Sequence, residues 1–349
     1  MANNLFDKLN DDKLSRRTVL KIGIATGVGL AGLSVAGCTS PGPTTTPLPS
    51  AVPLKSSVPS GYMQSDHSAA IFVADSKGIF KKYGLNIQLT LFTAGGPIMQ
   101  QIGAGTLDLG FAGVPPVIAS IDNGVPTKIV AALQGNGSGI IVGKNSGITK
   151  VADLKGKKIA VPVKNSSIQD IMLRQLLKDN NIDYEKDVSV TTVAVGQMPA
   201  AIGAGTYDAA FTWEPFVSMT AMKNLGNILI RSNEIMPNHP CCCVAATTTM
   251  IEQYPDTLKA FFKALKEATD FVLTNPQDTA QIISGKDYLN DEAAIEAAAL
   301  PNVHFLAVPD EEYISGTEKF AAEMKALGVT KKDHDRSDLF DLSLINQVT

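Results

Sequence analysis

Hydrophobic and polar positions alternate between two spacings from Gly61 onward. Short apolar runs are followed by longer segments whose apolar positions recur at every third or fourth residue, as in buried strands and amphipathic helices. Strands are predicted at residues 85–92, 107–113, 128–133, 139–143, 154–162, 188–194, 227–232 and 241–248, and helices at 67–84, 96–105, 166–181, 255–275 and through the final third. This alternation indicates an α/β architecture with mostly parallel sheets.

One segment of the chain occurs twice. Residues 102–117, IGAGTLDLGFAGVPPV, and residues 202–217, IGAGTYDAAFTWEPFV, are identical at nine of sixteen aligned positions without a gap. Each copy predicts a helix that ends at glycine, a short buried strand and a proline-containing loop. The shared part predicts a common framework, and the variable part lies in the loops.

The two loops, residues 112–116 and 212–216, follow the carboxyl ends of strands, where ligands bind in α/β sheets. We therefore expect two similar lobes with a cleft between them and one loop on each wall. Val114 and Pro115 are the predicted ligand contacts of the first loop. The alternative is duplication of a packing unit that has no shared site.

The first 37 residues have the features of an export signal. A pair of arginines precedes an apolar run, residues 22–36, that is shorter than the roughly 20 residues of a membrane-spanning helix. The pattern resembles a twin-arginine signal, although Val19 replaces the usual phenylalanine, and general secretion stays open. Residues 35–38, VAGC, resemble a lipobox, in which Cys38 is acylated and becomes the new N-terminus.

Residues 38–60 are rich in proline, threonine and serine and are predicted to be a tether without a core. An uncleaved membrane anchor with an incidental cysteine is the alternative to a lipoprotein. Either interpretation places the folded part outside the cytoplasm, beside a membrane.

Composition and charge exclude some classes of protein. The 349 residues are 44% hydrophobic and 18% charged, as in soluble globular proteins. A net charge of −4 gives no sign of nucleic-acid binding. The four cysteines are Cys38 and residues 241–243, which is not the spaced, even set of a disulfide framework.

Candidate ligand contacts of the first lobe are Asp66, His67, Gly95 and Gly96. Asp66 and His67 lie where the first strand gives way to the first helix; His67 is a donor to an anionic ligand, whereas Asp66 has helix capping as its alternative. Gly95 and Gly96 open a helix, whose free N–H groups and dipole favour an anion. An ordinary helix start is the alternative.

Candidate contacts of the second lobe are Asn165, Ser166, Ser167, Trp213 and Glu214. The first three open another helix and add hydroxyl donors. The single tryptophan is predicted to stack on a flat ligand or to enclose an alkyl chain, with the core as its alternative. Glu214 suits a cationic group and therefore favours a zwitterionic or heterocyclic ligand, unless it pairs with a basic residue at the hinge.

The cysteine run has two interpretations. On a regular strand Cys241 and Cys243 share one face and Cys242 takes the other, and adjacent thiols seldom form disulfides. Small buried hydrophobic residues are the simpler interpretation, with Cys241 as a ligand contact. Soft-metal ligation together with His239 is the other.

Five segments carry a resemblance to a known family: DHSAAIFVADSKGIFKKYGLNIQL, AGGPIMQQIGAGTLDLGFAGVPP, VADLKGKKIAVP, AGTYDAAFTWEP and YPDTLKAFFKALKEATDFVLTNP. Together they resemble the solute-binding lipoproteins of ABC importers, in the nitrate/sulfonate/taurine group, which is related to thiamine-pyrimidine precursor-binding proteins. The resemblance implies a two-lobed, type II periplasmic-binding-protein-like fold that closes on a ligand. The implied lobes are 61–142 with 240–349, and 143–239, with crossings near 139–143 and 239–246.

The cysteine run also resembles that of the eukaryotic hydroxymethylpyrimidine phosphate synthases. That resemblance implies a cofactor-holding lysine and a substrate histidine in the first loop, where this chain has Ala112 and Pro116. Ala245 stands where the cysteine run of those enzymes finishes. The reactive side chains are therefore missing.

The sequence thus predicts a non-enzymatic receptor without a cofactor. It would be a lipid-anchored, monomeric component of an ABC importer that captures a small anionic or zwitterionic solute, such as a sulfonate, taurine or nitrate, and delivers it to the permease. Three alternatives remain: a thiamine-pyrimidine precursor binder, a metal-dependent enzyme that uses residues 241–243, and a sensory partner of a membrane receptor.

Overall fold

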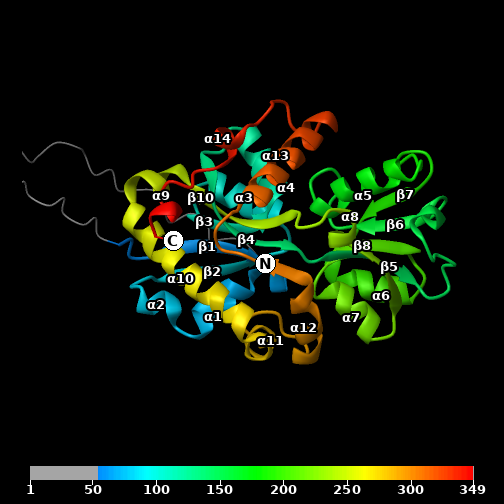
Figure 1. Ribbon diagram of the computed structural model, residues 1–349, viewed down its shortest axis with the longest axis horizontal. Coiled ribbons are helices and arrows are strands. Elements are labelled where there is room, and N and C mark those ends of the chain that lie inside the picture. Colours follow the sequence, from blue (N-terminus) through cyan, green and yellow to red (C-terminus); the bar gives the residue numbers. More distant parts are fainter. Residues whose placement is uncertain (1–53, 349) are drawn as a thin grey trace, which may run out of the picture. The chain divides into compact units, whose positions relative to one another are not determined.

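The computed structural model describes residues 54–348, which contain two β-sheets covered by helices (Figure 1). The expected export signal, the lipidation site Cys38 and most of the expected tether lie outside the described residues. None of the helices within residues 54–348 combines the length and apolarity that a membrane crossing requires.

The first sheet has six strands in the order β11-β4-β10-β3-β1-β2. Their bounds are Val58–Met63 for β1, Ile87–Phe92 for β2, Leu109–Gly113 for β3, Thr127–Asn136 for β4, Pro240–Thr247 for β10 and Val303–Phe305 for β11. β1 pairs in parallel with β2 and β3, whereas β10 is antiparallel to β3 and β4. β1 begins inside the expected tether, because Val58 and Ser60 are fully buried in this sheet.

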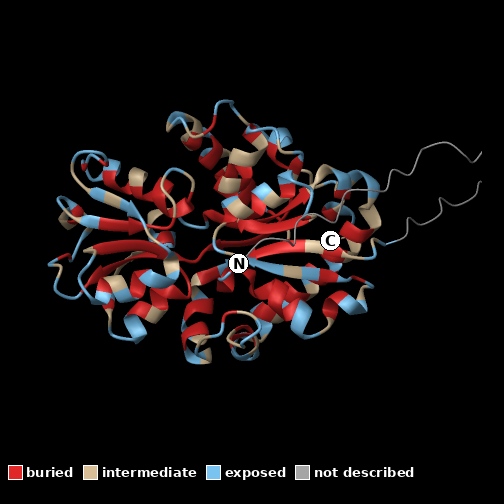
Figure 2. Ribbon diagram, turned by 180° about the vertical axis from the view of Figure 1, so that it is seen from behind, coloured by how far each residue is buried: buried red, intermediate tan, exposed pale blue. Residues whose placement is uncertain are grey.

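The second sheet has five strands in the order β7-β6-β8-β5-β9. Their bounds are Ser138–Gly143 for β5, Lys158–Val161 for β6, Ser189–Thr192 for β7, Ala209–Trp213 for β8 and Gly226–Arg231 for β9. β6 pairs in parallel with β7 and β8, and β5 is antiparallel to β8 and β9. Figure 2 shows the central strands of both sheets largely buried, whereas the edge strands β2 and β7 carry exposed positions, as do the helices and loops.

As expected, most strands of each sheet run in one direction, four of six in the first and four of five in the second; the exceptions are β10, β11 and β5. β10 and β5 each enter their sheet from the other lobe. β3 and β8 end at the junction between the lobes, whereas β10 and β5 begin there, so they run in the opposite direction to their neighbours. Alternation of strands and helices along the chain carries no information about such an inserted strand. Both sheets are therefore mixed.

Helices cover both faces of each sheet. Around the first sheet, α1, α2, α10 and α11 lie on one side and α3, α4 and α13 on the other (Figure 1). Their bounds are Ala69–Ser76 for α1, Ile79–Lys82 for α2, Gly95–Gly103 for α3, Val114–Asp122 for α4, Pro255–Thr274 for α10, Pro276–Ile283 for α11 and Glu311–Ala326 for α13; α9 (Thr248–Gln253), α12 (Ala293–Ala299) and α14 (Arg336–Leu339) complete this lobe. The second lobe has α5 (Ile168–Asp179), α6 (Met198–Gly203), α7 (Phe216–Met222) and α8 (Ser232–Ile235).

Apolar spacing explains the long helix α10. Its residues Leu258, Phe261 and Leu265 are buried at intervals of three and four, which places them on one stripe that packs on the sheet. The ring of Phe261 stacks on both Phe80 and Phe111, with centroids 6.0 Å apart in each pair. The predicted helix 67–84 is broken in two, because Gly78 takes a φ of 67° between α1 and α2.

The repeated sequence forms the same unit in both lobes, α3-β3-α4 in the first and α6-β8-α7 in the second. Gly105 and Gly205 occupy equivalent positions after the helices and have φ values of 73° and 71°. Only glycine adopts this conformation without strain, which explains why both copies keep it. The buried rings of Phe111 and Phe211 anchor the two strands.

The chain passes between the lobes twice. β4 ends at Asn136 and β5 begins at Ser138, so the first passage is at Gly137, just before the expected 139–143. The second passage lies between the end of β9 and the start of β10, and it reaches the first sheet within the expected 239–246. Each passage is followed by the antiparallel strand of the sheet that it enters.

Candidate functional site

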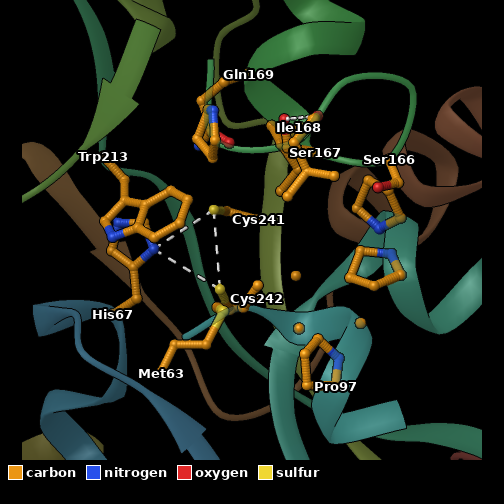
Figure 3. Close-up of a pocket in the computed structure, with 18 residues that line it drawn as sticks. Met63, His67, Pro97, Ser166, Ser167, Ile168, Gln169, Trp213, Cys241 and Cys242 are labelled. Atoms are coloured by element: carbon orange, nitrogen blue, oxygen red, sulfur yellow. Dashed lines mark hydrogen bonds between the residues drawn. The ribbon is translucent and has the colours of Figure 1, made fainter. Parts of the chain in front are cut away.

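A cavity of about 140 Å³ lies at the junction of the two lobes, and residues of both lobes line it (Figure 3). The predicted contacts that line it are His67, Gly95, Gly96, Pro115, Ser166, Ser167, Trp213 and Cys241. The predicted contacts that do not line it are Asp66, Val114, Asn165 and Glu214. Gly113 and Pro116 of the predicted loop 112–116 also line the cavity. Eight further lining residues were not predicted: Met63, Ala94, Pro97, Pro162, Val163, Ile168, Gln169 and Cys242.

The N-terminus of α3 forms one wall of the cavity. Ala94 precedes the helix and provides no side-chain cap. Since Pro97 has no N–H group, the backbone N–H groups of Gly95 and Gly96 are the free donors of the first turn. A Cβ on Gly95 would lie 2.8 Å from Cγ of Pro116, which explains the close packing of α3 against the start of α4. Backbone N–H groups at such an end favour negatively polarised atoms.

The N-terminus of α5 forms the facing wall. Ser167 is its N-cap: its Oγ accepts from the N–H of Asp170 at 3.2 Å and donates to the carbonyl of Val163 at 2.7 Å. The amide of Gln169 donates to Oγ of Ser138 at 2.8 Å. Asn165 lies outside the cavity, since its Oδ1 accepts from the guanidinium of Arg174 at 2.7 Å.

Of the polar residues that follow β1, Asp66 is buried away from the cavity and Ser65 caps the next turn. Asp66 is fully buried and does not line the cavity, and neither carboxylate oxygen has a hydrogen-bond partner in the described chain. The expectation that Asp66 caps the helix is wrong, because the extended Ser65 precedes the turn and accepts from the N–H of His67 at 3.2 Å. Burial raises the pKa of Asp66 to about 8, against the opposing effect of His67.

His67 is held between the two lobes. Its Nε2 donates to the carbonyl of Gly137 at 3.0 Å, which leaves Nδ1 facing the sulfur atoms of Cys241 and Cys242 at 3.6 and 3.7 Å. Burial lowers the pKa of His67, but the charge on Cys241 and its hydrogen bond outweigh burial and raise the pKa to about 9.

The two cysteine side chains reach the same cavity because β10 is irregular. Its register with β4 shifts between Pro240 and Cys242 and again between Cys242 and Cys243, and such a bulge re-aims side chains. The expectation that Cys241 and Cys243 share one face is therefore wrong. Cys243 donates instead to the carbonyl of Ala112, at 3.6 Å.

His239 does not join the cysteines as the metal interpretation supposed. Its Nδ1 donates to the carbonyl of Pro240 at 3.1 Å, and its ring packs edge-on against Phe320, with centroids 6.5 Å apart. The histidine beside the thiols is His67, which is 174 residues from Cys241 in the sequence. His239 was chosen because it is close to the cysteines in the sequence, but His67 is the histidine that is close to them in space.

The ionisation of the cysteines differs along the strand. Burial opposes ionisation of Cys241, yet the hydrogen bond from Cys242 and the positive charge of His67 hold its pKa well below the usual range. The hydrogen bond with Cys241, together with burial, raises the pKa of Cys242. Cys241 is therefore the more acidic of the two thiols, whose sulfur atoms lie 4.0 Å apart.

The carboxylate of Glu214 forms its hydrogen bonds inside the protein and does not line the cavity. Its carboxylate accepts from the N–H and Oγ of Ser218 at 2.8 Å, from Arg231 at 2.8 Å and from Asn302 of the first lobe at 3.1 Å. Burial raises its pKa, and the bonds from Ser218 and Arg231 oppose that rise. Because Glu214 is fully occupied, the argument that it favours a zwitterionic or heterocyclic ligand no longer holds.

Trp213 lines the cavity from the second lobe. It is 8% exposed, and its indole N–H makes no hydrogen bond to the described protein. Figure 3 shows the indole on the same side of the cavity as His67, with Met63 reaching toward Cys242. Among the lining residues of the described chain there is no lysine, arginine, aspartate or glutamate. The cavity therefore offers an aromatic face, backbone donors, sulfur atoms and the imidazole of His67.

Comparison with known families assigns the chain. The model of the NMT1-like family matches residues 52–284, which include the second sheet, five of the six strands of the first sheet and every residue that lines the cavity. The chain belongs to the NMT1-like family.

Relatives of this NMT1-like protein include named binding proteins. It is 30% identical over 230 residues to a Brucella abortus (strain 2308) protein named as a binding protein, a match that covers 65% of this chain and 70% of the relative. It is also 30% identical over 220 residues to a Bacillus subtilis (strain 168) protein named for binding aliphatic sulfonates, covering 61% of this chain and 65% of the relative.

Solved structures share the fold of the NMT1-like protein. The alkanesulfonate-binding protein of Xanthomonas axonopodis pv. citri, bound to MOPS, has a TM-score of 0.71 at 17% identity, with 82% of this chain and 99% of that chain covered. The periplasmic nitrate-binding protein of Synechocystis PCC 6803 has a TM-score of 0.73 at 19% identity, with 84% and 88% covered. The expected resemblance to nitrate- and sulfonate-type solute-binding proteins and the two-lobed fold are confirmed.

The residues that sequence reasoning missed in this NMT1-like protein fall into two kinds. Six lie within three residues of predicted contacts at two helix starts: Ala94, Pro97, Pro162, Val163, Ile168 and Gln169. The other two, Met63 and Cys242, required knowledge of the strand register. A bulge and the end of a strand beginning at Val58 leave no periodic signal in the sequence.

Proposed function

We propose that this protein is the solute-binding component of an ABC importer. The observation that carries the proposal is a small cavity whose walls come from both lobes, with the N-terminus of α3 on one side and that of α5 and Trp213 on the other. Contacts from two lobes allow a solute to stabilise the closed arrangement, as in hinged binding proteins. Family membership and the binding-protein relatives support the same proposal.

The size and lining of the cavity limit the solute. A volume of about 140 Å³ is close to that of cavities that hold one benzene-sized molecule, about 150 Å³. Backbone donors of Gly95 and Gly96 suit a small anionic or zwitterionic group, such as sulfonate, taurine or nitrate. The sulfonate-binding name of one relative supports this class.

A flat, neutral heterocycle is the second candidate. The lining of the described chain has no lysine or arginine, whereas Trp213 offers a ring face and an unpaired N–H donor. These features suit a thiamine-pyrimidine precursor. The same experiment separates the two candidates.

The proposal extends to the location and partners of the protein. We infer a lipid anchor at Cys38 after an export signal, a monomeric state, and delivery of the solute to membrane permease subunits without chemical conversion. Mass spectrometry of the membrane-extracted protein would detect a diacylglyceryl group on Cys38. An unmodified N-terminus that starts at Met1 would contradict the anchor.

The single tryptophan makes the proposed site directly observable. We expect that taurine, an alkanesulfonate, nitrate, bicarbonate or a hydroxymethylpyrimidine, added one at a time, will change the fluorescence of Trp213 and raise the melting temperature. A solute at 100 times its Kd stabilises the native state by about 2.7 kcal/mol. A set of solutes that changes neither signal would contradict the proposed solute classes.

A further inference from the structure

The cavity contains a set of three side chains with the composition of a metal site. Nδ1 of His67 and the sulfur atoms of Cys241 and Cys242 all lie within 4.8 Å of one another. The nitrogen is 3.6 and 3.7 Å from the two sulfurs, which are 4.0 Å apart. The three residues are at most 3% exposed, so this triangle is part of the folded interior.

These distances match the edges of a zinc coordination polyhedron. Zinc bonds of about 2.3 Å to sulfur and about 2.0–2.1 Å to nitrogen, at tetrahedral angles, give a sulfur–sulfur edge of about 3.8 Å and nitrogen–sulfur edges of about 3.6 Å. The observed edges of 4.0, 3.6 and 3.7 Å differ from these by 0.2 Å or less. No side chain needs to move far to place all three atoms around one ion.

The surroundings of His67 are those of a metal-binding imidazole. Its Nε2 donates to the carbonyl of Gly137, which fixes the ring and leaves Nδ1 directed at the sulfurs. Metal-ligating histidines generally have such a second hydrogen bond from the other nitrogen. A Cβ on Gly137 would lie 2.6 Å from Nε2, so only glycine at this position allows the approach.

The bulge in β10 supplies the two sulfurs. A regular strand would direct Cys241 and Cys242 to opposite faces, whereas the two register shifts direct both into the cavity. Thiolate and imidazole ligands select soft or borderline ions such as zinc over magnesium or calcium. The thioether of Met63, which points toward Cys242 in Figure 3, adds to the soft character of this wall.

We propose that His67 Nδ1, Cys241 Sγ and Cys242 Sγ bind a soft or borderline metal ion, with zinc as the reference ion. Binding would release to solvent the protons held by Cys242 and by Nδ1 of His67, and any that remains on Cys241, because thiolate and neutral imidazole are the ligating forms. All three residues line the cavity, so the fourth coordination position faces its interior, as in zinc sites that keep an open position.

The proposal is tested on the full-length, reduced protein after removal of metal by a chelator. Zinc is titrated in competition with a chromophoric chelator, and Co²⁺ is used as a spectroscopic probe. We expect one zinc per chain and, with cobalt, thiolate-to-metal charge-transfer absorption together with the intense visible bands of a tetrahedral site.

The chain provides matched variants for each ligand. Cys241→Ser, Cys242→Ser and His67→Gln should each weaken zinc binding by at least ~100-fold, the upper end of the loss caused even by outer-sphere changes. Cys243→Ser and His239→Gln change the same residue types nearby, at side chains that lie outside the triangle, and should stay within about threefold of the unaltered protein. Cys38 is common to all the proteins and does not affect the comparison.

Two results would overturn the proposal. One is the absence of a thiolate-to-cobalt band in the unaltered protein, a measurement that does not depend on whether any variant folds. The other is a loss in Cys243→Ser equal to that in Cys241→Ser, with matching melting temperatures. The inference goes beyond the proposed solute binding: solute titrations on metal-free protein are separate measurements, so either conclusion can fail while the other stands.

Discussion

Trp213 and Glu214 are adjacent in the chain and have opposite surroundings. The indole faces the cavity and has an unpaired N–H group, whereas the Glu214 carboxylate is enclosed by Ser218, Arg231 and Asn302. One residue is thus available to a solute, and the other fastens the second lobe to the first. Their different roles arise at the end of β8, where the chain turns from the cavity wall into the core.

Replacing Trp213 by alanine should separate solute binding from stability. Loss of the ring face removes about 1–1.5 kcal/mol of aromatic contact, and solute affinity should fall about tenfold. The free energy of unfolding should fall by less than the about 3–5 kcal/mol typical of a fully packed tryptophan. Calorimetric titration and denaturant unfolding measure the two effects, and Trp213→Phe serves as the conservative control. Full core-type destabilisation with unchanged affinity would mean that the ring only packs.

At the residue scale, sequence reasoning located positions near helix starts and strand ends. Ser166, Gly95 and Trp213 were found because those positions lie at the edge of a sheet where ligands bind. The orientation of a side chain at such a position depends on its contacts, so Glu214 and Asp66 were placed at the site although both are fully buried. Cys242 was missed because an ideal strand directs it away from Cys241.

At the scale of elements, the repeated helix–strand unit makes a paired prediction. Gly105 and Gly205 both have a positive φ, and a Cβ there meets nothing within 4 Å, so backbone strain is the only cost of a side chain. Changing either glycine to alanine should reduce the free energy of unfolding by about 1 kcal/mol. Chemical denaturation measures the effect.

The exposed Gly196 is the matched control for this pair, because its φ is not positive and its surroundings are open. Gly196→Ala should leave stability nearly unchanged. If Gly105→Ala and Gly196→Ala had equal effects, the left-handed turns would not be the reason for the repeated glycines.

Elements with a strong periodic signal were predicted, and elements defined by tertiary contacts were not. Helix α10 and strand β2 appear close to their predicted ranges, since apolar spacing alone defines them. β1 starts at Val58 within a segment that contains proline and serine, and its pairing with β2 and β3 makes it a strand. Strand direction in the two sheets depends on which strands cross between the lobes, which local pattern does not encode.

At the scale of the whole described chain, buried acids gather where the lobes meet. Helix α12 contacts α7 of the second lobe, and Glu296 in α12 is fully buried. Burial, followed by the charge of Asp66 and the interaction with Asp291, raises the pKa of Glu296 to about 11, and Glu214 adds to the rise. The junction therefore holds Glu296 in its protonated form at neutral pH.

The raised pKa of Glu296 makes the free energy of unfolding depend on pH. Because the pKa of Glu296 in the folded state lies above its ordinary value of 4.5, its favourable contribution is complete below about pH 4.5 and is lost as the pH rises toward about 11. Glu296→Gln should remove this part of the slope and stabilise the protein at pH 8 by about 1–3 kcal/mol. Denaturant unfolding of both proteins at several pH values measures this difference in stability. A variant that keeps the full slope would exclude Glu296 as its source.

Gly137 lies where the chain first passes from one lobe to the other. It is the single residue between β4 and β5, and its carbonyl accepts both from Nε2 of His67 and from the N–H of Glu214, at 3.0 and 2.9 Å. If the lobes close on a solute as proposed, rotation of the backbone at Gly137 would move the carbonyl that holds the imidazole. The direction of Nδ1 toward the two sulfurs would then change with the angle between the lobes.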